Sequence, residues 1–318
     1  MAEQTTSSLE SLGLTSVGGQ SSSGAVNRVA VVGGGETGQG IAEAVSQAGI
    51  EVILIGENAD CLETALKGLS AGLDREIDTW GLTGSEKRAI LARVTGSTSL
   101  SEASGAPFVI EAIREDLDAK KKLIAELDSI CPAKTVIATN SASLGVTEIA
   151  SGANGRHRVI GLRFLEPVPK APVVEIARAH DTSLEVYLRT KDFAEKQLRK
   201  TTVDVTGHPG GITTRILLAA LKEAFCCLEE GIATAEDIDI TGSLGWGVPQ
   251  GPLALADQMG LDVLMGWMEN IARAPGCERF RPCPKIAKLV RDGCLGKKTG
   301  CGVFEYDERG NRLSKSTS

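Results

Sequence analysis

The amino-acid sequence predicts an α/β protein with an N-terminal domain built on a parallel sheet and a C-terminal domain that is all helical. Three observations point to this fold. The chain has 318 residues, which is enough for two domains of ordinary size. Up to residue 207, short apolar runs alternate with amphipathic stretches, as in a parallel sheet covered by helices. Beyond residue 207 the strand-like runs stop and only helix-like segments follow.

The first domain begins with a predicted β-α-β unit. An apolar run at 28–33 ends in glycines, a helix-like stretch follows to Ala48, and a second apolar run covers 51–55. Amphipathic stretches such as Leu117 to Leu127 separate the later strand candidates. The later candidates are Phe108 to Ala112, Thr135 to Ala138, Val159 to Leu162, Val173 to Ile176 and Thr202 to Val205.

The second domain is predicted to contain helices only. The segments Ile216 to Leu228 and Leu253 to Ile271 have helical patterns, and no β-like run lies between them. We place the domain boundary near residue 207. Residues 1–26 carry clusters of Ser, Thr and Gly with few large apolar groups, so we expect them to form a disordered tail.

Composition and charge argue against several classes of protein. Apolar residues make up 42% of the chain and charged residues 24%, as in an ordinary globular enzyme. The 34 Lys and Arg against 41 Asp and Glu give a net charge of −7, which argues against nucleic acid as a partner. No apolar run is long enough to span a membrane, and the N-terminus does not resemble a signal peptide. We therefore expect a cytoplasmic protein without a membrane partner.

The cysteines and histidines do not predict a metal site. The eight cysteines form no Cys-x-x-Cys pair, which favours reduced thiols. The adjacent Cys226 and Cys227 lie on a predicted helix and face different directions, so we expect them to pack rather than react. The three histidines lie far apart and have no metal-ligand spacing with the cysteines.

A glycine-rich motif directly follows the first strand. Gly33, Gly35 and Gly38 satisfy G-x-G-x-x-G and open a helix. In a β-α-β unit, the first glycine makes the tight turn, the second lets the backbone approach a pyrophosphate and the third lets the helix pack close to the strand. The motif predicts a Rossmann-type dinucleotide-binding domain over 27–207; the alternative is a glycine-rich loop in an α/β fold without a ligand.

The residues after the second strand favour NAD over NADP. The motif expects an acidic side chain about 20 residues after the glycines, where it holds the ribose hydroxyls. Gly56 stands at this position, and Glu57 follows it. Because no Arg or Lys lies nearby to accept a 2′-phosphate, we predict that Glu57 holds the ribose of NAD.

Several segments beyond the glycine loop resemble the L-3-hydroxyacyl-CoA dehydrogenases. The resemblance extends from about Asn27 to Tyr306 and covers both predicted domains. The segments that carry it are VIEAI at 109–113, TNSASL at 139–144, VIGLRFLEPVP at 159–169, VE at 174–175, GPLALAD at 251–257, GLD at 260–262 and LGKKTGCG at 295–302.

The resemblance implies a function in fatty acid metabolism and roles for particular residues. A 3-hydroxyacyl-CoA dehydrogenase transfers hydride to NAD, and its helical domain, here 208–318, binds the acyl-CoA substrate and pairs two subunits. The chain is thus expected to be a homodimer that acts on a small molecule such as an acyl-CoA. By resemblance, Glu111, Lys120 and Asn140 are cofactor contacts and Ser141, Ser143 and Thr214 contact the substrate.

The segments that align with the family's catalytic motifs carry different residues. The family's His-Phe-Phe-Asn-Pro stands here as Arg163-Phe-Leu-Glu166-Pro, so the residue in place of the base is Arg163. The family's serine aligns with Ala142, and its asparagine aligns with Thr214. Glu175 alone is kept. We name Glu175, Arg163 and Glu166 as candidate catalytic residues and expect them to form a charged trio.

These differences leave two functions open. Arginine is always protonated and offers only donors, so it cannot act as a general base. The chain is either a divergent NAD-dependent oxidoreductase, in which Arg163 grips a carboxylate or polarises a carbonyl, or a non-redox protein. The non-redox alternative covers a pseudoenzyme that binds cofactor or acyl-CoA and a fold reused for lyase or proton-transfer chemistry. His208 is a candidate replacement base. The trio has an alternative interpretation as a structural ion-pair cluster without a catalytic role.

Overall fold

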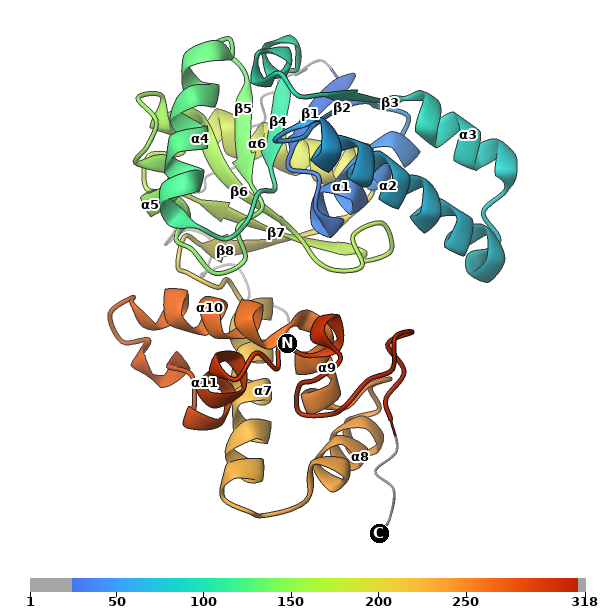
Figure 1. The fold of residues 1–318 in the computed structure, drawn as a ribbon. Coiled ribbons are helices and arrows are strands. Elements are labelled where there is room, and N and C mark those ends of the chain that lie inside the picture. The colour runs from blue at the N-terminus through green and yellow to red at the C-terminus, as the bar shows by residue number, and fades with distance from the viewer. Residues whose placement is uncertain (1–24, 314–318) are drawn as a thin grey trace, which may run out of the picture.

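The computed structural model describes residues 25–313, which form a sheet domain and a helical domain (Figure 1). The sheet has eight strands in the order β3-β2-β1-β4-β5-β6-β7-β8. Strands β1 to β6 run parallel to their neighbours, β7 is antiparallel to β6, and β8 is parallel to β7. The strands are β1 Arg28–Val32, β2 Glu51–Ile55, β3 Val94–Ser97, β4 Phe108–Glu111, β5 Val136–Thr139, β6 Val159–Phe164, β7 Val173–Arg178 and β8 Thr201–Thr206.

Two features of the sheet differ from the prediction. The edge strand β3 was not expected, because its sequence Val-Thr-Gly-Ser is short, polar and only partly buried. It pairs with β2 at the edge of the sheet, where a strand can remain partly exposed and does not need an apolar pattern. The sheet is also not wholly parallel, because the link from β6 to β7 is too short for the crossover that a parallel pair requires.

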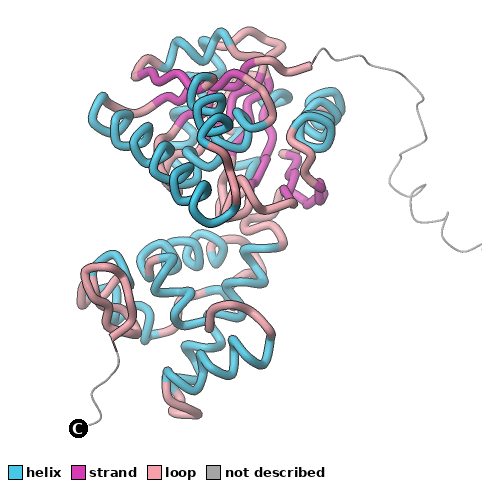
Figure 2. Tube along the Cα trace, turned by 90° about the vertical axis from the view of Figure 1, so that its right-hand side faces the viewer, coloured by secondary structure: helices cyan, strands magenta, loops and turns pink. Residues whose placement is uncertain are grey.

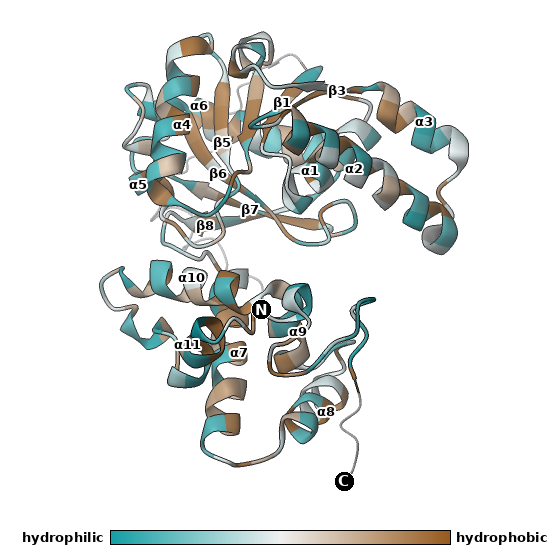
Figure 3. Ribbon diagram, viewed as in Figure 1, coloured by the Kyte–Doolittle hydropathy of each residue, from teal (hydrophilic) through white to brown (hydrophobic). Residues whose placement is uncertain are grey.

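Helices cover both faces of the sheet and bury two apolar layers. Along β1, Val29 and Val31 belong to one layer and Ala30 and Val32 to the other, as expected for alternating side chains. Figure 3 shows the strands largely in the hydrophobic colour, while α2 and α3 carry hydrophilic segments. The helices of this domain are α1 Glu36–Gln47, α2 Ala59–Trp80, α3 Gly84–Ala92, α4 Leu117–Ile130, α5 Val146–Ala150 and α6 Leu184–Asp192.

The second domain contains helices and loops below the sheet domain (Figure 2) and has its own apolar core. The predicted Rossmann-type domain followed by an all-helical domain is therefore confirmed. The single helix predicted for 253–271 is wrong, because Gly260 has a φ of +94° and separates two helices. The helices are α7 Thr213–Glu229, α8 Ala235–Trp246, α9 Pro252–Met259, α10 Leu261–Ala272 and α11 Pro284–Arg291.

The cysteines correct the expectation of reduced thiols. Cys294 and Cys301 form a disulfide across a short turn that includes Lys297–Thr299, while the other six cysteines are free. Cys226 is partly buried against the core of the helical domain, and burial raises the pKa of its thiol. A raised pKa disfavours the reactive thiolate, in line with a packing role.

Two further predictions concern the N-terminal tail and membrane-spanning helices. Residues 1–24 of the tail predicted over 1–26 lie outside the described residues. Val26 is buried, and both its N–H and its carbonyl hydrogen-bond the side chain of Gln197, so the ordered domain begins before residue 27. Within residues 25–313, no helix combines the length and the apolar character needed to cross a bilayer.

Candidate functional site

The three motif glycines at the loop between β1 and α1 lie in different surroundings, so each is explained by a different constraint. Gly33 has a φ of +121°, and a Cβ there would collide with the carbonyl of Ala112. A Cβ at Gly38 would collide with the carbonyl of Gly33, because the helix packs close to the strand. A Cβ at Gly35 would meet no atom within 4 Å. Gly33 and Gly38 are thus needed for the fold itself, whereas Gly35 leaves open space at the start of α1.

This open space fits the pyrophosphate of a dinucleotide. No side chain caps the N-terminus of α1 at Gly35, so the first N–H groups of the helix are available to an anion, which the helix dipole also favours. At the end of β2, a Cβ at Gly56 would lie 2.9 Å from Cβ of Leu62. The backbone therefore has no room for an acid at position 56, and the exposed Glu57 is the first side chain able to reach a ribose.

A cleft of about 420 Å³ lies between the two domains at the carboxyl edge of the sheet. Its walls come from the start of α1, from the loops that follow β4 and β5, and from α10 of the helical domain. Of the predicted site residues, Lys120 and Asn140 line this cleft. The lining residues are Thr37, Ala112, Ile113, Arg114, Glu115, Lys120, Asn140, Ala142, Asp262, Val263, Gly266 and Trp267.

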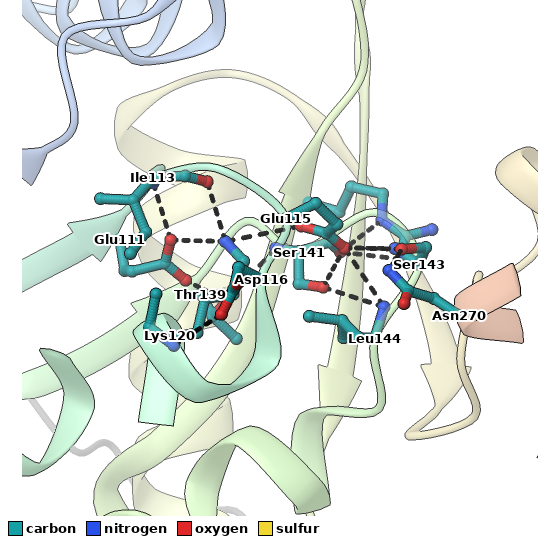
Figure 4. A network of polar contacts seen from close by, with 12 residues as sticks. Glu111, Ile113, Glu115, Asp116, Lys120, Thr139, Ser141, Ser143, Leu144 and Asn270 are labelled. Carbon is teal, nitrogen blue, oxygen red and sulfur yellow. Dashed lines mark hydrogen bonds and ion pairs between the residues drawn. The ribbon is translucent and has the colours of Figure 1, made fainter. Parts of the chain in front are cut away.

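Glu111 and Lys120 form a buried ion pair beneath the cleft (Figure 4). The Lys120 ammonium lies 2.6 Å from one carboxylate oxygen of Glu111 and also donates to the carbonyl of Ile113. The second Glu111 oxygen accepts the Thr139 hydroxyl at 2.6 Å. Glu111 is 0% exposed, so the structure places its carboxylate in the floor of the loop and away from the surface of the cleft.

Glu115 links this pair to the loop after β5, and sequence reasoning missed it. One of its carboxylate oxygens accepts the hydroxyls of Ser141 and Ser143 and the backbone N–H groups of Ser143 and Leu144. The other lies 3.5 Å from the Lys120 ammonium. Burial alone would raise the pKa of Glu115, but the Lys120 charge and these hydrogen bonds outweigh it, so the pKa is lowered. The carboxyl group is therefore ionised at neutral pH.

The predicted substrate-binding residues Ser141 and Ser143 have their hydroxyls engaged in this network. Both donate to Glu115, and Ser141 accepts the N–H of Leu144. The Ser143 oxygen also accepts the amide of Asn270 on α10 at 2.9 Å. Figure 4 shows Asn270 reaching the network from the helical domain. The loop after β5 is thus joined to both domains.

Arg163 and Glu175 lie side by side on β6 and β7 and form a second buried pair. One Arg163 Nη atom lies 3.1 Å from Glu175 and donates to the carbonyl of Gly210, while the other Nη and the Nε donate to the carbonyl of Ser141. The same Nη that faces Glu175 lies 3.4 Å from the hydroxyl of Thr214.

Glu175 also joins the two domains. Its carboxylate accepts the backbone N–H and the hydroxyl of Thr213, at the first residue of α7. Gly211 lies against the pair with a φ of +51°, and a Cβ there would collide with Glu175 and lie 2.6 Å from Arg163. Arg163 and Glu175 are 11% and 3% exposed and are not part of the cleft lining.

The expected trio of Arg163, Glu175 and Glu166 is not formed. Glu166 lies beyond the end of β6 and is exposed. Its carboxylate accepts the hydroxyl of Thr37, in the first turn of α1, at 2.7 Å and the N–H of Val168. The trio prediction was wrong because the chain turns after Phe164, which carries Glu166 toward the start of α1.

The remaining candidates are distributed between the cleft and the surface. The Asn140 side-chain oxygen accepts the N–H of Phe164, which fixes the amide at the wall of the cleft. His208 is exposed in the link between the domains and is not part of the cleft lining. Within residues 25–313, no three His, Cys, Asp or Glu side chains form a group that could hold a metal ion.

Both domains match one protein family. Residues 28–208 match the NAD binding domain of 3-hydroxyacyl-CoA dehydrogenase, and residues 210–306 match its C-terminal domain. A probable 3-hydroxybutyryl-CoA dehydrogenase of Bacillus subtilis is 40% identical over 284 residues, covering 89% of this chain and 99% of that protein.

Solved structures agree with this match. The crystal structure of M. tuberculosis FadB2 aligns with a TM-score of 0.85 at 33% sequence identity. (S)-3-hydroxybutyryl-CoA dehydrogenase PaaH1 from Ralstonia eutropha aligns with a TM-score of 0.81 at 36% identity. Each comparison covers 89% of this chain and 100% of the other, so the similarity includes both domains.

Proposed function

The chain belongs to the 3-hydroxyacyl-CoA dehydrogenase family, and on that premise we propose that it is an NAD-dependent oxidoreductase with altered chemistry. Its substrate is an acyl-CoA or another carboxylate-bearing hydroxy or oxo compound. The observation that carries the proposal is the cleft, which runs from Thr37 in the first turn of α1 to α10 and is lined by polar groups from both domains. A cofactor and a substrate can meet there.

The residues around α1 fit the cofactor. The N–H groups at the start of α1 and the open space at Gly35 would hold the pyrophosphate, and Glu57 would hold the ribose. Residues 51–66 contain no Lys or Arg that could bind a 2′-phosphate, which favours NAD over NADP. When bound, NAD supplies a hydride acceptor, and NADH a hydride donor.

Arg163 makes this chemistry different from histidine-based oxidation. Four of the five N–H groups of its guanidinium are used by Ser141, Glu175 and Gly210. The fifth, on the Nη atom that donates to Ser141, is left for an oxygen of a substrate that reaches past Ala142 in the cleft wall, and it can polarise or orient that oxygen. Since arginine does not accept the proton of a hydroxyl group, oxidation of a 3-hydroxyacyl-CoA should be about 10²- to 10⁴-fold slower than with a positioned base.

A second candidate function is a non-redox protein that binds cofactor or acyl-CoA without turnover. One observation favours it specifically: the hydroxyls of Ser141 and Ser143 and both carboxylate oxygens of Glu175 are already bonded within the protein. Such a site holds its own side chains in place rather than a reacting oxygen. Arg163 and Glu175 are then a structural ion pair.

Two titrations separate these functions. Nicotinamide fluorescence and the melting temperature would be followed while NADH or NADPH is added, since a ligand that binds the folded state raises the melting temperature. Saturable NADH binding followed by NADH consumption with 3-oxoacyl-CoA or 2-oxo acid substrates supports the oxidoreductase. Binding without consumption of NADH by any of them supports the non-redox protein, and no binding of either dinucleotide contradicts the proposed cofactor.

We also propose that the helical domain pairs two copies of the chain. Large apolar side chains are exposed on α7 and α8, among them Ile216 at 67%, Leu244 at 80% and Trp246 at 62%. Apolar groups gathered on a surface often mark a protein–protein interface. Leu244→Asp should convert a dimer to a monomer in sedimentation velocity, with Glu223→Asp on the same domain as the control. A wild-type chain that sediments as a monomer contradicts the proposal.

A further inference from the structure

A second hollow lies on the sheet domain, away from the cleft between the domains, and no function has been assigned to it so far. It has a volume of about 500 Å³ and lies between the second half of α1, the loop after β6 and the turn that precedes β8. We call it the Lys200 groove. Its lining includes three cations and no carboxylate, and consists of Ala44, Gln47, Ala48, Pro169, Lys196, Gln197, Leu198, Arg199 and Lys200.

Lys200 is a buried cation without a carboxylate partner. The residue is 7% exposed, and its ammonium donates to the carbonyls of Val168 and Ala171 at 2.9 and 2.6 Å. No ion pair to Lys200 is formed within residues 25–313, and burial lowers the pKa of its ammonium. A buried charge is costly unless an opposite charge compensates it, and the third N–H of Lys200 remains available for such a partner.

Arg199, the preceding residue, is held in an unfavourable backbone conformation. The turn after Phe193–Gln197 ends with hydrogen bonds from Leu198 to Phe193 and from Lys200 to Ala194, and these require a left-handed residue between them. Arg199 has a φ of 55° and is the one non-glycine residue of 25–313 with a positive φ. Glycine would adopt this conformation without strain. The backbone therefore does not favour arginine at this position.

The other polar groups of the groove have partners within the protein. Lys196 pairs with Asp192 at 2.9 Å, Gln197 bonds the backbone of Val26, and the Gln47 amide donates to Glu43. Arg199 is exposed and makes no side-chain hydrogen bond or ion pair in the described part of the chain. The positive charges of the groove that lack a carboxylate are therefore those of Arg199 and Lys200.

We propose that the Lys200 groove binds a phosphate-bearing small molecule through the ammonium of Lys200 and the guanidinium of Arg199. Two uncompensated cations match the charge of about −2 that a phosphate monoester carries at neutral pH. The fork of N–H groups on arginine suits phosphate oxygens, and the lysine acts as a point charge beside it. The site is separate from the glycine loop and does not depend on the proposed oxidoreductase activity.

Calorimetric titration of the full chain with inorganic pyrophosphate tests the site, with Arg199→Gly as the main variant and Lys200→Met as the second. Loss of one charge-assisted contact should weaken binding about tenfold or more. Without ligand, Arg199→Gly should raise the melting temperature by about 1–3 °C, because glycine relieves the left-handed backbone. Arg88→Gln, an exposed arginine on α3, removes the same charge elsewhere and should leave the affinity unchanged.

The outcomes are distinct. The glycine loop is the same in all these proteins, so any difference between the wild type and Arg199→Gly measures the groove. Equal pyrophosphate affinity in the two, or no binding by the wild type, would overturn the proposal. A matching loss in Arg88→Gln would also overturn it, by showing an effect of net charge. If citrate binds the wild type as tightly as pyrophosphate does, the assignment to phosphate is wrong.

Discussion

The glycine loop and the Arg163–Glu175 pair are both candidate parts of one site, but they differ in what the protein leaves free. At the loop, the space at Gly35 is open and the N–H groups of α1 have no side-chain cap. At the pair, nearly every donor and acceptor is already bonded within the protein. The comparison teaches that the glycine loop, the proposed cofactor half of the site, has open space and free N–H groups, whereas the Arg163–Glu175 pair, the proposed reaction half, is largely filled by its own side chains.

The largest effect on stability should come from removing one residue of the Arg163–Glu175 pair. Glu175→Ala would leave Arg163 buried without its carboxylate and α7 without its cap, and should lower the free energy of unfolding by about 3–5 kcal/mol. Urea denaturation would measure this. The double variant Arg163→Met/Glu175→Leu removes both charges and should lose much less. Equal losses in the two proteins would show that the unpaired charge is not the cause.

A second buried carboxyl, Glu43 on α1, contrasts with Glu175 because neighbouring cations do not fully compensate its negative charge. Burial and the charge of Glu76 raise the pKa of Glu43 from 4.5 to about 7, against the opposing effect of Lys170. Between these pH values the folded chain binds more protons than the unfolded chain, so stability falls as pH rises, by about 3 kcal/mol in total.

Glu43→Gln should remove this pH dependence. Its stability should match that of the wild type near pH 4 and exceed it at pH 8, as measured by the melting temperature at each pH. Glu63→Gln, an exposed glutamate paired with Lys67 on α2, serves as the control and should change little. A wild-type melting temperature that stays constant between pH 5 and 8 would contradict the expectation.

Restoring the residues that the family resemblance expects would test whether the reaction half can be reopened. The triple variant Ala142→Ser, Arg163→His and Thr214→Asn should oxidise 3-hydroxybutyryl-CoA with NAD about 100-fold faster than the wild type, because a general base contributes about 10²–10⁴-fold. Formation of NADH would be followed by absorbance. If the triple variant binds NADH but shows no gain, the reaction half has been remodelled beyond these three positions.

The smallest effect is expected in the open half. Gly35→Ala places a methyl group where, apart from its chain neighbours, no protein atom lies within 4 Å, so the free energy of unfolding should change by less than about 1 kcal/mol. NADH affinity should fall about tenfold, because the methyl group occupies the space proposed for the pyrophosphate. Fluorescence titration measures the affinity. Unchanged NADH binding would show that the dinucleotide does not approach this residue.

The sequence was sufficient to predict the two-domain fold and the glycine loop, because both depend on local signals. Apolar runs give the strands, and the spacing of Gly33, Gly35 and Gly38 is set by a single tight turn. The edge strand β3 and the break at Gly260 escaped prediction. A half-exposed strand needs no apolar pattern, and one glycine within a helical pattern does not by itself indicate a break.

The site was harder to predict because its contacts join residues far apart in the chain. Glu115 receives hydrogen bonds from residues 26 to 29 positions later, and its only local signal is its place in the loop after a buried strand. Glu166 follows Arg163 closely in sequence, yet it bonds Thr37 at a distance of 129 residues. Proximity in sequence was therefore a poor guide to which charges meet.

Gly211 couples position 211 to the Arg163–Glu175 pair. A Cβ at position 211 would collide with the Glu175 carboxylate and lie 2.6 Å from the Arg163 guanidinium, so a larger residue at 211 requires both side-chain ends to move. A change of side chain at 163 alters the space open at 211, and a larger residue at 211 displaces the guanidinium at 163. The two positions are epistatic and should be varied together in any library built on this protein.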